Sequence, residues 1–231
     1  MRMFNLLTLI TVLALMVGCS DSTENSRANT DQPNAVVPKH IQRFSAPESL
    51  TTGQAANVLE FFSYSCLHCQ AFAPLISDWS TQQQASVEYV PVAWNEDTEL
   101  YARFFYLIRS QSNFAELHPL LFERVMSLDS HEPLDQRKIL LIEWLQQQGI
   151  EPVETLNLLS SEAVEQAIGR VKQLSAHYQI ASTPTLVVNG TDKILNSELT
   201  SYQHLLDVAT SQLLPQRAPQ ASQPKAPGVA Q

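Results

Sequence analysis

Cys66 and Cys69 stand two residues apart, at the point where an apolar run gives way to a helical pattern. The run Val58–Phe62 predicts a buried strand, and the segment Cys66–Gln84 predicts a helix. A cysteine that opens a helix faces the partial positive charge of the helix N-terminus, which favours a thiolate. Cys66-Leu67-His68-Cys69 therefore predicts a pair that cycles between dithiol and disulfide, with Cys66 as the nucleophile.

A zinc site and a structural disulfide are the alternatives for this motif. A zinc site needs four ligands, commonly a second Cys-x-x-Cys or a pair of histidines. The chain has only three cysteines, and its other histidines show no ligand spacing, so no metal is expected. A structural disulfide around a two-residue loop would constrain the unfolded chain very little. His118 and His131, in the helical part of the chain, are expected on the surface.

The third cysteine, Cys19, follows a segment typical of export signals. Residues 1–18 contain one early charge, Arg2, and an apolar stretch, Phe4–Val17, that is short for a membrane span of about 20 residues. The segment resembles a bacterial lipoprotein signal, in which cleavage precedes a cysteine that becomes lipidated, although Met16 stands where leucine is usual. An ordinary secretory signal is the alternative. Lipidation of Cys19 would leave an even pair of cysteines in a compartment that permits disulfides.

Charge and glycine usage exclude two classes of function. The formal net charge is −9 and the basic residues form no stripe, which argues against a nucleic-acid partner. The chain has no G-x-G-x-x-G or Walker loop, so a nucleotide site is not expected.

The folded body is expected between a polar tether, residues 19–39, and a Pro/Gln/Ala-rich tail, residues 215–231. Residues 96–178 read as helices with four apolar stripes that face a core. They separate residues 40–95 from residues 179–214. We therefore predict an α/β domain made of the two outer segments, with an all-helical insertion between them.

Further elements follow from apolar periodicity and turn residues. Apolar residues on both faces of Val87–Trp94 predict a central strand, although Pro91 is unusual there. Asn189-Gly190 predicts a hairpin turn between the strands Thr185–Asn189 and Lys193–Leu195. A last helix is expected over Glu198–Leu213. The first helix has an inward stripe made of Phe72, Leu75, Ile76 and Trp79.

A second signal, Thr183-Pro184, stands directly before the strand that starts at Thr185. An ordinary trans proline at a strand start is the alternative. Together with the Cys-x-x-Cys motif, this dipeptide resembles the thioredoxin superfamily, in which a cis-proline loop packs against the two cysteines. The resemblance implies that the backbone at Thr183 and Pro184 pairs with an extended substrate peptide.

The segments Leu59–Cys69 and Thr185–Gly190, with the helical region between them, resemble the DsbA family of periplasmic thiol oxidases. The resemblance implies a thioredoxin fold with a helical insertion between the second core strand and the cis-proline loop. It also implies dithiol–disulfide exchange with exported cysteine-containing polypeptides and no bound cofactor. A DsbB-like membrane partner would reoxidise the pair.

The same resemblance assigns roles to four residues. Cys66 would be the exposed reacting sulfur and Cys69 the buried resolving sulfur. His68 would stabilise the Cys66 thiolate, and with it the reduced protein; a plain surface position is the alternative. Glu60, in an apolar strand where an ionised carboxylate is costly, would exchange a proton with Cys69; the alternative is a side chain that reaches solvent at a strand end.

Two departures from the family pattern concern the direction of exchange. Leu67 replaces the usual proline of the dipeptide, and Thr183 stands where the best-known oxidases have valine. Threonine there resembles isomerases and reductases. The expected activity is oxidation of exported proteins by a lipid-anchored periplasmic protein. A reductase or isomerase is the first alternative, and a peptide-binding or chaperone lipoprotein without redox turnover is the second.

Overall fold

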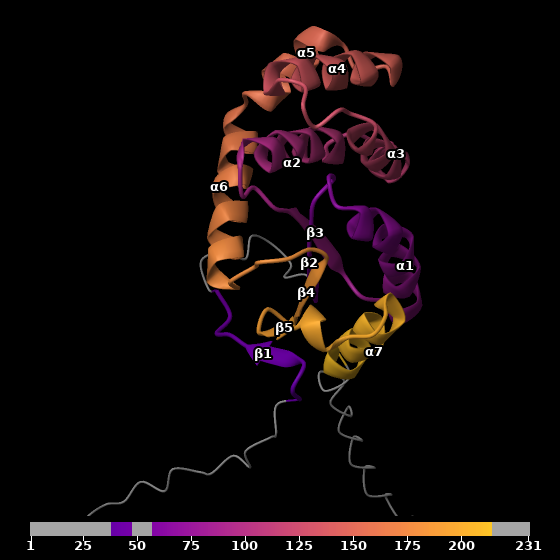
Figure 1. Ribbon diagram of the computed structural model, residues 1–231, viewed down its shortest axis with the longest axis vertical. Helices are drawn as coiled ribbons and strands as arrows, with labels where there is room; N and C mark the ends of the chain where they lie inside the picture. Colours follow the sequence, from indigo (N-terminus) through magenta and orange to yellow (C-terminus); the bar gives the residue numbers. More distant parts are fainter. Residues whose placement is uncertain (1–37, 48–56, 214–231) are drawn as a thin grey trace, which may run out of the picture. The chain divides into compact units, whose positions relative to one another are not determined.

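The computed structural model describes residues 38–47 and 57–213 (Figure 1). The predicted export signal, Cys19 and the predicted tail lie outside these residues. The strands are β1 (Ile41–Arg43), β2 (Val58–Phe62), β3 (Val87–Pro91), β4 (Thr185–Val188) and β5 (Asp192–Ile194). The helices are α1 (Leu67–Gln83), α2 (Glu96–Arg109), α3 (Phe114–Met126), α4 (Leu134–Gln147), α5 (Pro152–Leu159), α6 (Glu162–His177) and α7 (Tyr202–Leu213), with a 3-10 turn at Asn196–Glu198.

The strands form one mixed sheet in the order β1-β5-β4-β2-β3. β2 pairs in parallel with β3 and antiparallel with β4, and the remaining pairs are antiparallel. Every residue of β2 is buried, because both faces of this central strand are covered. The β4–β5 hairpin turns at Asn189 and Gly190, which both adopt positive φ, as a tight hairpin turn requires.

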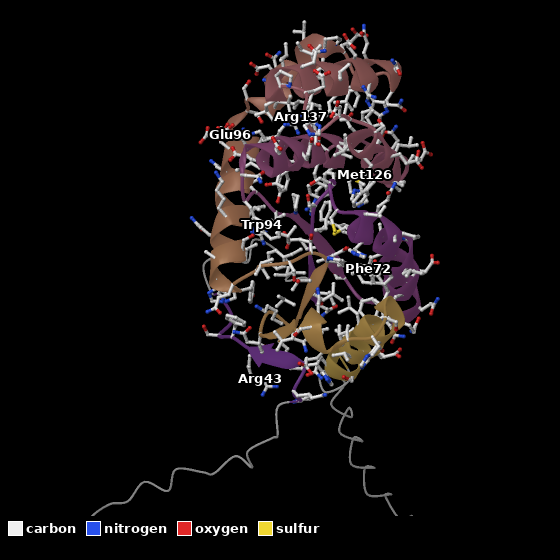
Figure 2. All side chains as sticks on the ribbon, in the orientation of Figure 1. Arg43, Phe72, Trp94, Glu96, Met126 and Arg137 are labelled. Atoms are coloured by element: carbon white, nitrogen blue, oxygen red, sulfur yellow. The ribbon has the colours of Figure 1, made fainter. Side chains whose placement is uncertain are left out.

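Helices cover both faces of the sheet (Figure 1). α1 and α7 pack on one face, where Phe72 points from α1 into the core (Figure 2). α6 covers the other face through Val171, Leu174 and Tyr178. Successive residues of a strand point to opposite faces, and Phe61 packs on the α6 side. Glu60 therefore points to the face that α1 and α7 cover.

The helices α2 to α5 lie beyond one end of the sheet (Figure 1). Arg137 of α4 ties two of them together, since it donates to Asp97 Oδ1 at 2.6 Å and to the Tyr101 hydroxyl at 2.8 Å, both on α2 (Figure 2). The core of this helical block also contains Phe62, Tyr64 and Cys69. The block is thus packed directly onto the segment that carries the cysteine motif.

The structure confirms the predicted order of strand, helix, strand, helical block, hairpin and final helix. Two expectations are corrected. The strand predicted at Val87–Trp94 is an edge strand, not a central one. It ends at Pro91, and a proline suits an edge position because it has no N–H to donate to a further strand. Leu75, expected to face inward, is 41% exposed.

Three further features differ from the sequence pattern. β1 was not predicted, because three residues are too short for a periodicity signal. α5 is a helix that none of the four predicted stripes marked, and it begins with a proline in its first turn. The last helix begins at Tyr202, after the 3-10 turn. None of the described helices is long and apolar enough to cross a membrane.

Ile76 and its neighbour Leu75 provide a matched test of the packing of α1 on the sheet. Ile76 is fully buried, whereas the isomeric Leu75 is 41% exposed. Ile76→Ala is expected to lower the free energy of unfolding by about 2–5 kcal/mol, because it leaves a cavity in the core. Leu75→Ala is expected to cost less than about 1 kcal/mol. Urea denaturation of both variants measures the difference, and equal losses would contradict this packing.

Candidate active site

The N-terminus of α1 carries both cysteines. Cys66 is the N-cap residue, and its sulfur accepts a hydrogen bond from the Cys69 backbone N–H at 3.2 Å. The Cys66 side chain is half-buried, whereas Cys69 is completely buried in the core of the helical block. Both cysteines are free thiols. One sulfur is therefore open to a reaction partner, and the other is enclosed one turn into the helix.

The two thiols differ strongly in acidity. The pKa of Cys66 is lowered to about 6, chiefly by a hydrogen bond from the Cys69 side chain, and further by contacts with Thr183 and with backbone N–H groups of the first turn. Burial is the main cause that raises the pKa of Cys69, and its hydrogen bond to Cys66 adds to it. At neutral pH the pair therefore holds a thiolate at Cys66 and a protonated thiol at Cys69.

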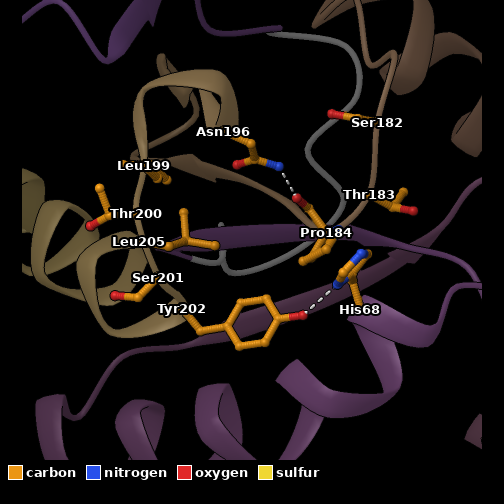
Figure 3. A pocket seen from close by; sticks show the side chains of 10 residues that line it. All are labelled: His68, Ser182, Thr183, Pro184, Asn196, Leu199, Thr200, Ser201, Tyr202 and Leu205. Atoms are coloured by element: carbon orange, nitrogen blue, oxygen red, sulfur yellow. Dashed lines mark hydrogen bonds between the residues drawn. The ribbon is translucent and has the colours of Figure 1, made fainter.

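The Thr183–Pro184 peptide bond is cis, and this loop faces the cysteine motif. The Cys66 thiol lies 3.5 Å from the carbonyl oxygen of Thr183, which is 117 positions away in the sequence. Asn196, in the turn before α7, donates to the Pro184 carbonyl from its side-chain amide (Figure 3). The structure thus brings together Cys66, Thr183 and Pro184, which the sequence analysis had singled out separately.

A pocket of about 570 Å³ opens beside the cis-proline loop. His68 and Pro184 lie on one side of it, and the start of α7 lies opposite (Figure 3). His68 is exposed, and its Nδ1 lies 2.9 Å from the hydroxyl of Tyr202. The pocket therefore adjoins the cysteine motif through His68 and the cis-proline loop.

Glu60 lies in the middle of β2, where its side chain is 2% exposed. Burial raises the pKa of its carboxyl to about 8, and the negative charge on Cys66 adds to this effect. Tyr89 lies opposite Glu60 on β3, where burial raises the pKa of Tyr89 to about 12 and the Glu60 carboxylate adds to this effect. Glu60 is therefore a buried acid that is mostly protonated at neutral pH and within electrostatic reach of Cys66.

Comparison with known proteins identifies the family. A family model described as the DSBA-like thioredoxin domain matches residues 74–207, which is more than half of the 231-residue chain. The chain belongs to this family. The matched segment begins inside α1, so the placement of the two cysteines rests on the geometry given above.

Curated relatives carry the name thiol:disulfide interchange protein DsbA. The protein from Bordetella parapertussis is 29% identical over 135 residues, which cover 58% of this chain and 63% of that protein. The one from Pseudomonas aeruginosa is 27% identical over 154 residues, or 66% of this chain and 72% of that protein. The chain thus matches less than two thirds of the length of the Bordetella relative.

Solved DsbA structures share the fold. The crystal structure of Pseudomonas aeruginosa DsbA superposes with a TM-score of 0.64 at 24% identity and covers 77% of this chain and 91% of that one. DsbA from Xylella fastidiosa gives a TM-score of 0.65 at 19% identity, covering 78% and 96%. The predicted thioredoxin fold with a helical insertion is confirmed.

The position of His118 differs from the one predicted from the sequence. It was expected on the surface, but it is only 8% exposed and its Nδ1 lies 2.6 Å from the hydroxyl of Tyr64, two residues before Cys66. Burial lowers the pKa of His118 to about 4 and raises that of Tyr64. The imidazole is therefore neutral, and it shares a hydrogen bond with the Tyr64 hydroxyl. This bond ties helix α3 to the loop that joins β2 and α1.

The sequence held a signal for one of the residues that were missed. His118 lies four positions before Phe122 and seven before Val125, which places it on the buried stripe of α3. No local pattern marks Tyr202 or Asn196, because both approach the site only through the packing of α7 and the preceding turn against the cis-proline loop. Among the described residues, no three His, Cys, Asp or Glu side chains cluster so as to hold a metal ion.

Two shifted pKa values make the stability of the reduced protein depend on pH. Glu60 rises from 4.5 to about 8, so between these values the folded protein binds one more proton than the unfolded chain, and stability falls as pH rises. The pKa of Cys66 falls from 9.0 to about 6, so between these values the unfolded chain binds more protons and stability rises with pH. The two effects oppose each other between about pH 6 and pH 8.

Glu60→Gln separates the two effects, because it removes only the titrating carboxyl. Relative to reduced wild type, the reduced variant is expected to gain stability progressively from about pH 5 to pH 8, by about 3 kcal/mol at pH 7. Urea denaturation at several pH values measures the difference. Glu143→Gln, at an exposed position of α4, is the control and should give no such trend. A pH-independent difference for Glu60→Gln would contradict a titrating buried acid.

Proposed function

We propose that this protein is a thiol:disulfide oxidoreductase that introduces disulfides into exported proteins through Cys66 and Cys69. The observation that carries the proposal is the pairing of an accessible, acidified Cys66 with a buried, protonated Cys69, opposite a cis-proline loop. The name of the curated relatives, thiol:disulfide interchange protein, supports the same reaction.

The proposed reaction begins with the Cys66–Cys69 disulfide. A substrate thiolate attacks the Cys66 sulfur, a mixed disulfide forms, and Cys69 leaves with the electron pair of the broken S–S bond. Cys69 takes up a proton, for which the buried carboxyl of Glu60 is the proposed donor. A second substrate thiolate then attacks the substrate sulfur of the mixed disulfide, and Cys66 leaves as a thiolate. The substrate loses two electrons, and the enzyme ends as the dithiol.

The acidity of Cys66 supports the direction of this reaction. A thiol with a pKa of about 6 is mostly a thiolate at pH 7, so it is a good leaving group and the reduced enzyme is stabilised. Stabilisation of the dithiol makes the disulfide more oxidising. Leu67 and Thr183 oppose this inference, since they depart from the residues of the best-known oxidases. A reductase or isomerase is therefore the second candidate.

Substrate recognition in this proposal uses backbone and apolar surface. The backbone of Thr183 and Pro184 would pair with an extended peptide, which requires no particular substrate sequence. The adjoining pocket contains Leu199 and Leu205 and would accept an apolar side chain of the same peptide. The family resemblance implies a second partner, a membrane protein that would reoxidise the dithiol. No cofactor beyond the cysteine pair is proposed.

Two cysteine substitutions test the reaction. Cys66→Ser should abolish oxidation of a reduced dithiol peptide, because no accessible sulfur remains to form the mixed disulfide. Cys69→Ser, given a peptide–glutathione mixed disulfide, should accumulate a Cys66–peptide mixed disulfide, visible by mass spectrometry, because the Cys66 thiolate attacks the peptide sulfur, glutathione leaves as the thiolate, and the resolving sulfur is missing. The reduction potential of wild type, measured against glutathione, decides the direction. A value near that of thioredoxin, about −270 mV, would support the reductase instead.

A peptide-binding protein without turnover gives a different pattern. Cys66→Ser would then bind and protect unfolded clients as well as wild type does, and wild type would oxidise no dithiol peptide. This result would contradict the proposed enzyme.

We also propose that the protein acts in the periplasm, held to a bacterial membrane by a lipid on Cys19. The apolar segment Phe4–Val17, followed by Gly18-Cys19, supports this proposal. Mass spectrometry of the mature protein from membranes should find an N-terminal Cys19 that carries acyl chains. Cys19→Ala should release the protein from the membrane fraction. An unmodified N-terminus beyond Cys19 would contradict the anchor.

A further inference from the structure

We propose that Tyr202 is a positioning residue of the redox centre: its hydroxyl holds the His68 imidazole within the cysteine motif and thereby stabilises the dithiol form. The inference rests on the proposed dithiol–disulfide reaction and adds a residue from α7 to it. No sequence motif marks Tyr202, which lies within the predicted last helix.

The contact between the two side chains is direct. The Tyr202 hydroxyl lies 2.9 Å from His68 Nδ1. The centroids of the two rings are 6.4 Å apart, and the ring planes are inclined by 66°. The two side chains approach each other across the mouth of the pocket, with Pro184 beside them (Figure 3). The exposed imidazole of His68 is thus anchored by a residue 134 positions away.

Tyr202 is itself held in place, so that it can orient another group. It is the first residue of α7, and its ring packs on Phe72 of α1, with 5.5 Å between the two ring centroids. Phe72 is completely buried between α1 and the sheet. The hydroxyl is therefore presented by a helix and a core contact rather than by a loop, which reduces the entropy cost of orienting His68.

The phenol also responds to the cysteines. Burial raises the pKa of Tyr202, and the negative charge of the Cys66 thiolate raises it further. The hydroxyl therefore stays protonated while a thiolate is present. A phenol both donates and accepts hydrogen bonds, so it can bond Nδ1 in either tautomer of the imidazole.

This arrangement favours the reduced protein. The Tyr202 hydroxyl keeps the His68 imidazole at the first turn of α1, whose backbone N–H groups bond the Cys66 sulfur. Cys69 and Glu60, which lie near the thiolate, are both mostly neutral at pH 7. A ring N–H held there can donate to the thiolate, and an unanchored ring would spend less time there.

Tyr202→Phe tests the proposal, because it keeps the ring on Phe72 and removes only the hydroxyl. The Cys66 pKa, followed by thiolate absorbance, is expected to rise. The equilibrium constant for reduction by glutathione should fall by roughly threefold to tenfold, the usual range for one lost hydrogen bond. His68→Ala should change both quantities in the same direction. In the His68→Ala background, Tyr202→Phe should add nothing.

Tyr178→Phe is the matched control. It also removes one tyrosine hydroxyl, which donates to the Gly190 carbonyl at 2.9 Å, on the face of the sheet opposite α1. It should lower stability without changing the Cys66 pKa or the glutathione equilibrium.

Two results would overturn the proposal. One is wild-type values for Tyr202→Phe, and the other is an undiminished effect of Tyr202→Phe when His68 is absent. Both measurements use the purified protein with glutathione alone, so they remain informative even if the protein oxidises no peptide.

Discussion

The antiparallel register between β2 and β4 is the constraint on which the site depends. Glu60 of β2 lies opposite Leu186 of β4, so the end of β2 lies next to the start of β4. The chain leaves β2 toward Cys66 and enters β4 from Pro184. Two segments more than a hundred residues apart therefore meet at the same end of two paired strands, and the Cys66 sulfur approaches the Thr183 carbonyl. The helices α2 to α6 lie between these strands in the sequence, and the two strands nevertheless pair directly with each other in the sheet.

A second physical principle is the unequal environment of the two sulfurs. Cys66 receives hydrogen bonds from the first turn of α1, which stabilise negative charge. Cys69 is surrounded by Phe62, Tyr64 and the helical block, where charge is costly. A spacing of three residues along a helix is enough to place one sulfur at the surface and the other in the core. The proposed direction of disulfide transfer follows from this difference.

The sequence predicted what local patterns determine. Cys66, Cys69 and the strand that contains Glu60 were found because a motif, a capping position and an apolar run all lie within one short segment. Contacts that depend on packing were not predicted. His118 was expected at the surface although it lies against Tyr64, and Tyr202 reaches His68 only because α7 packs beside α1. β3 was expected in the centre of the sheet, because apolar residues on both faces indicate burial but not which neighbour a strand has.

The continuity of the core between Cys69 and the helical block has an evolutionary consequence. Substitutions at Leu121 or Phe122 of α3 alter the packing of the core to which the buried sulfur belongs, yet these side chains are buried away from substrate. Residues of the pocket beside the cis-proline loop, such as Leu199, lie where a bound peptide would approach. Selection can thus adjust the redox equilibrium from inside the helical block and partner choice from the surface. The two properties can diverge separately among descendants of one ancestral protein.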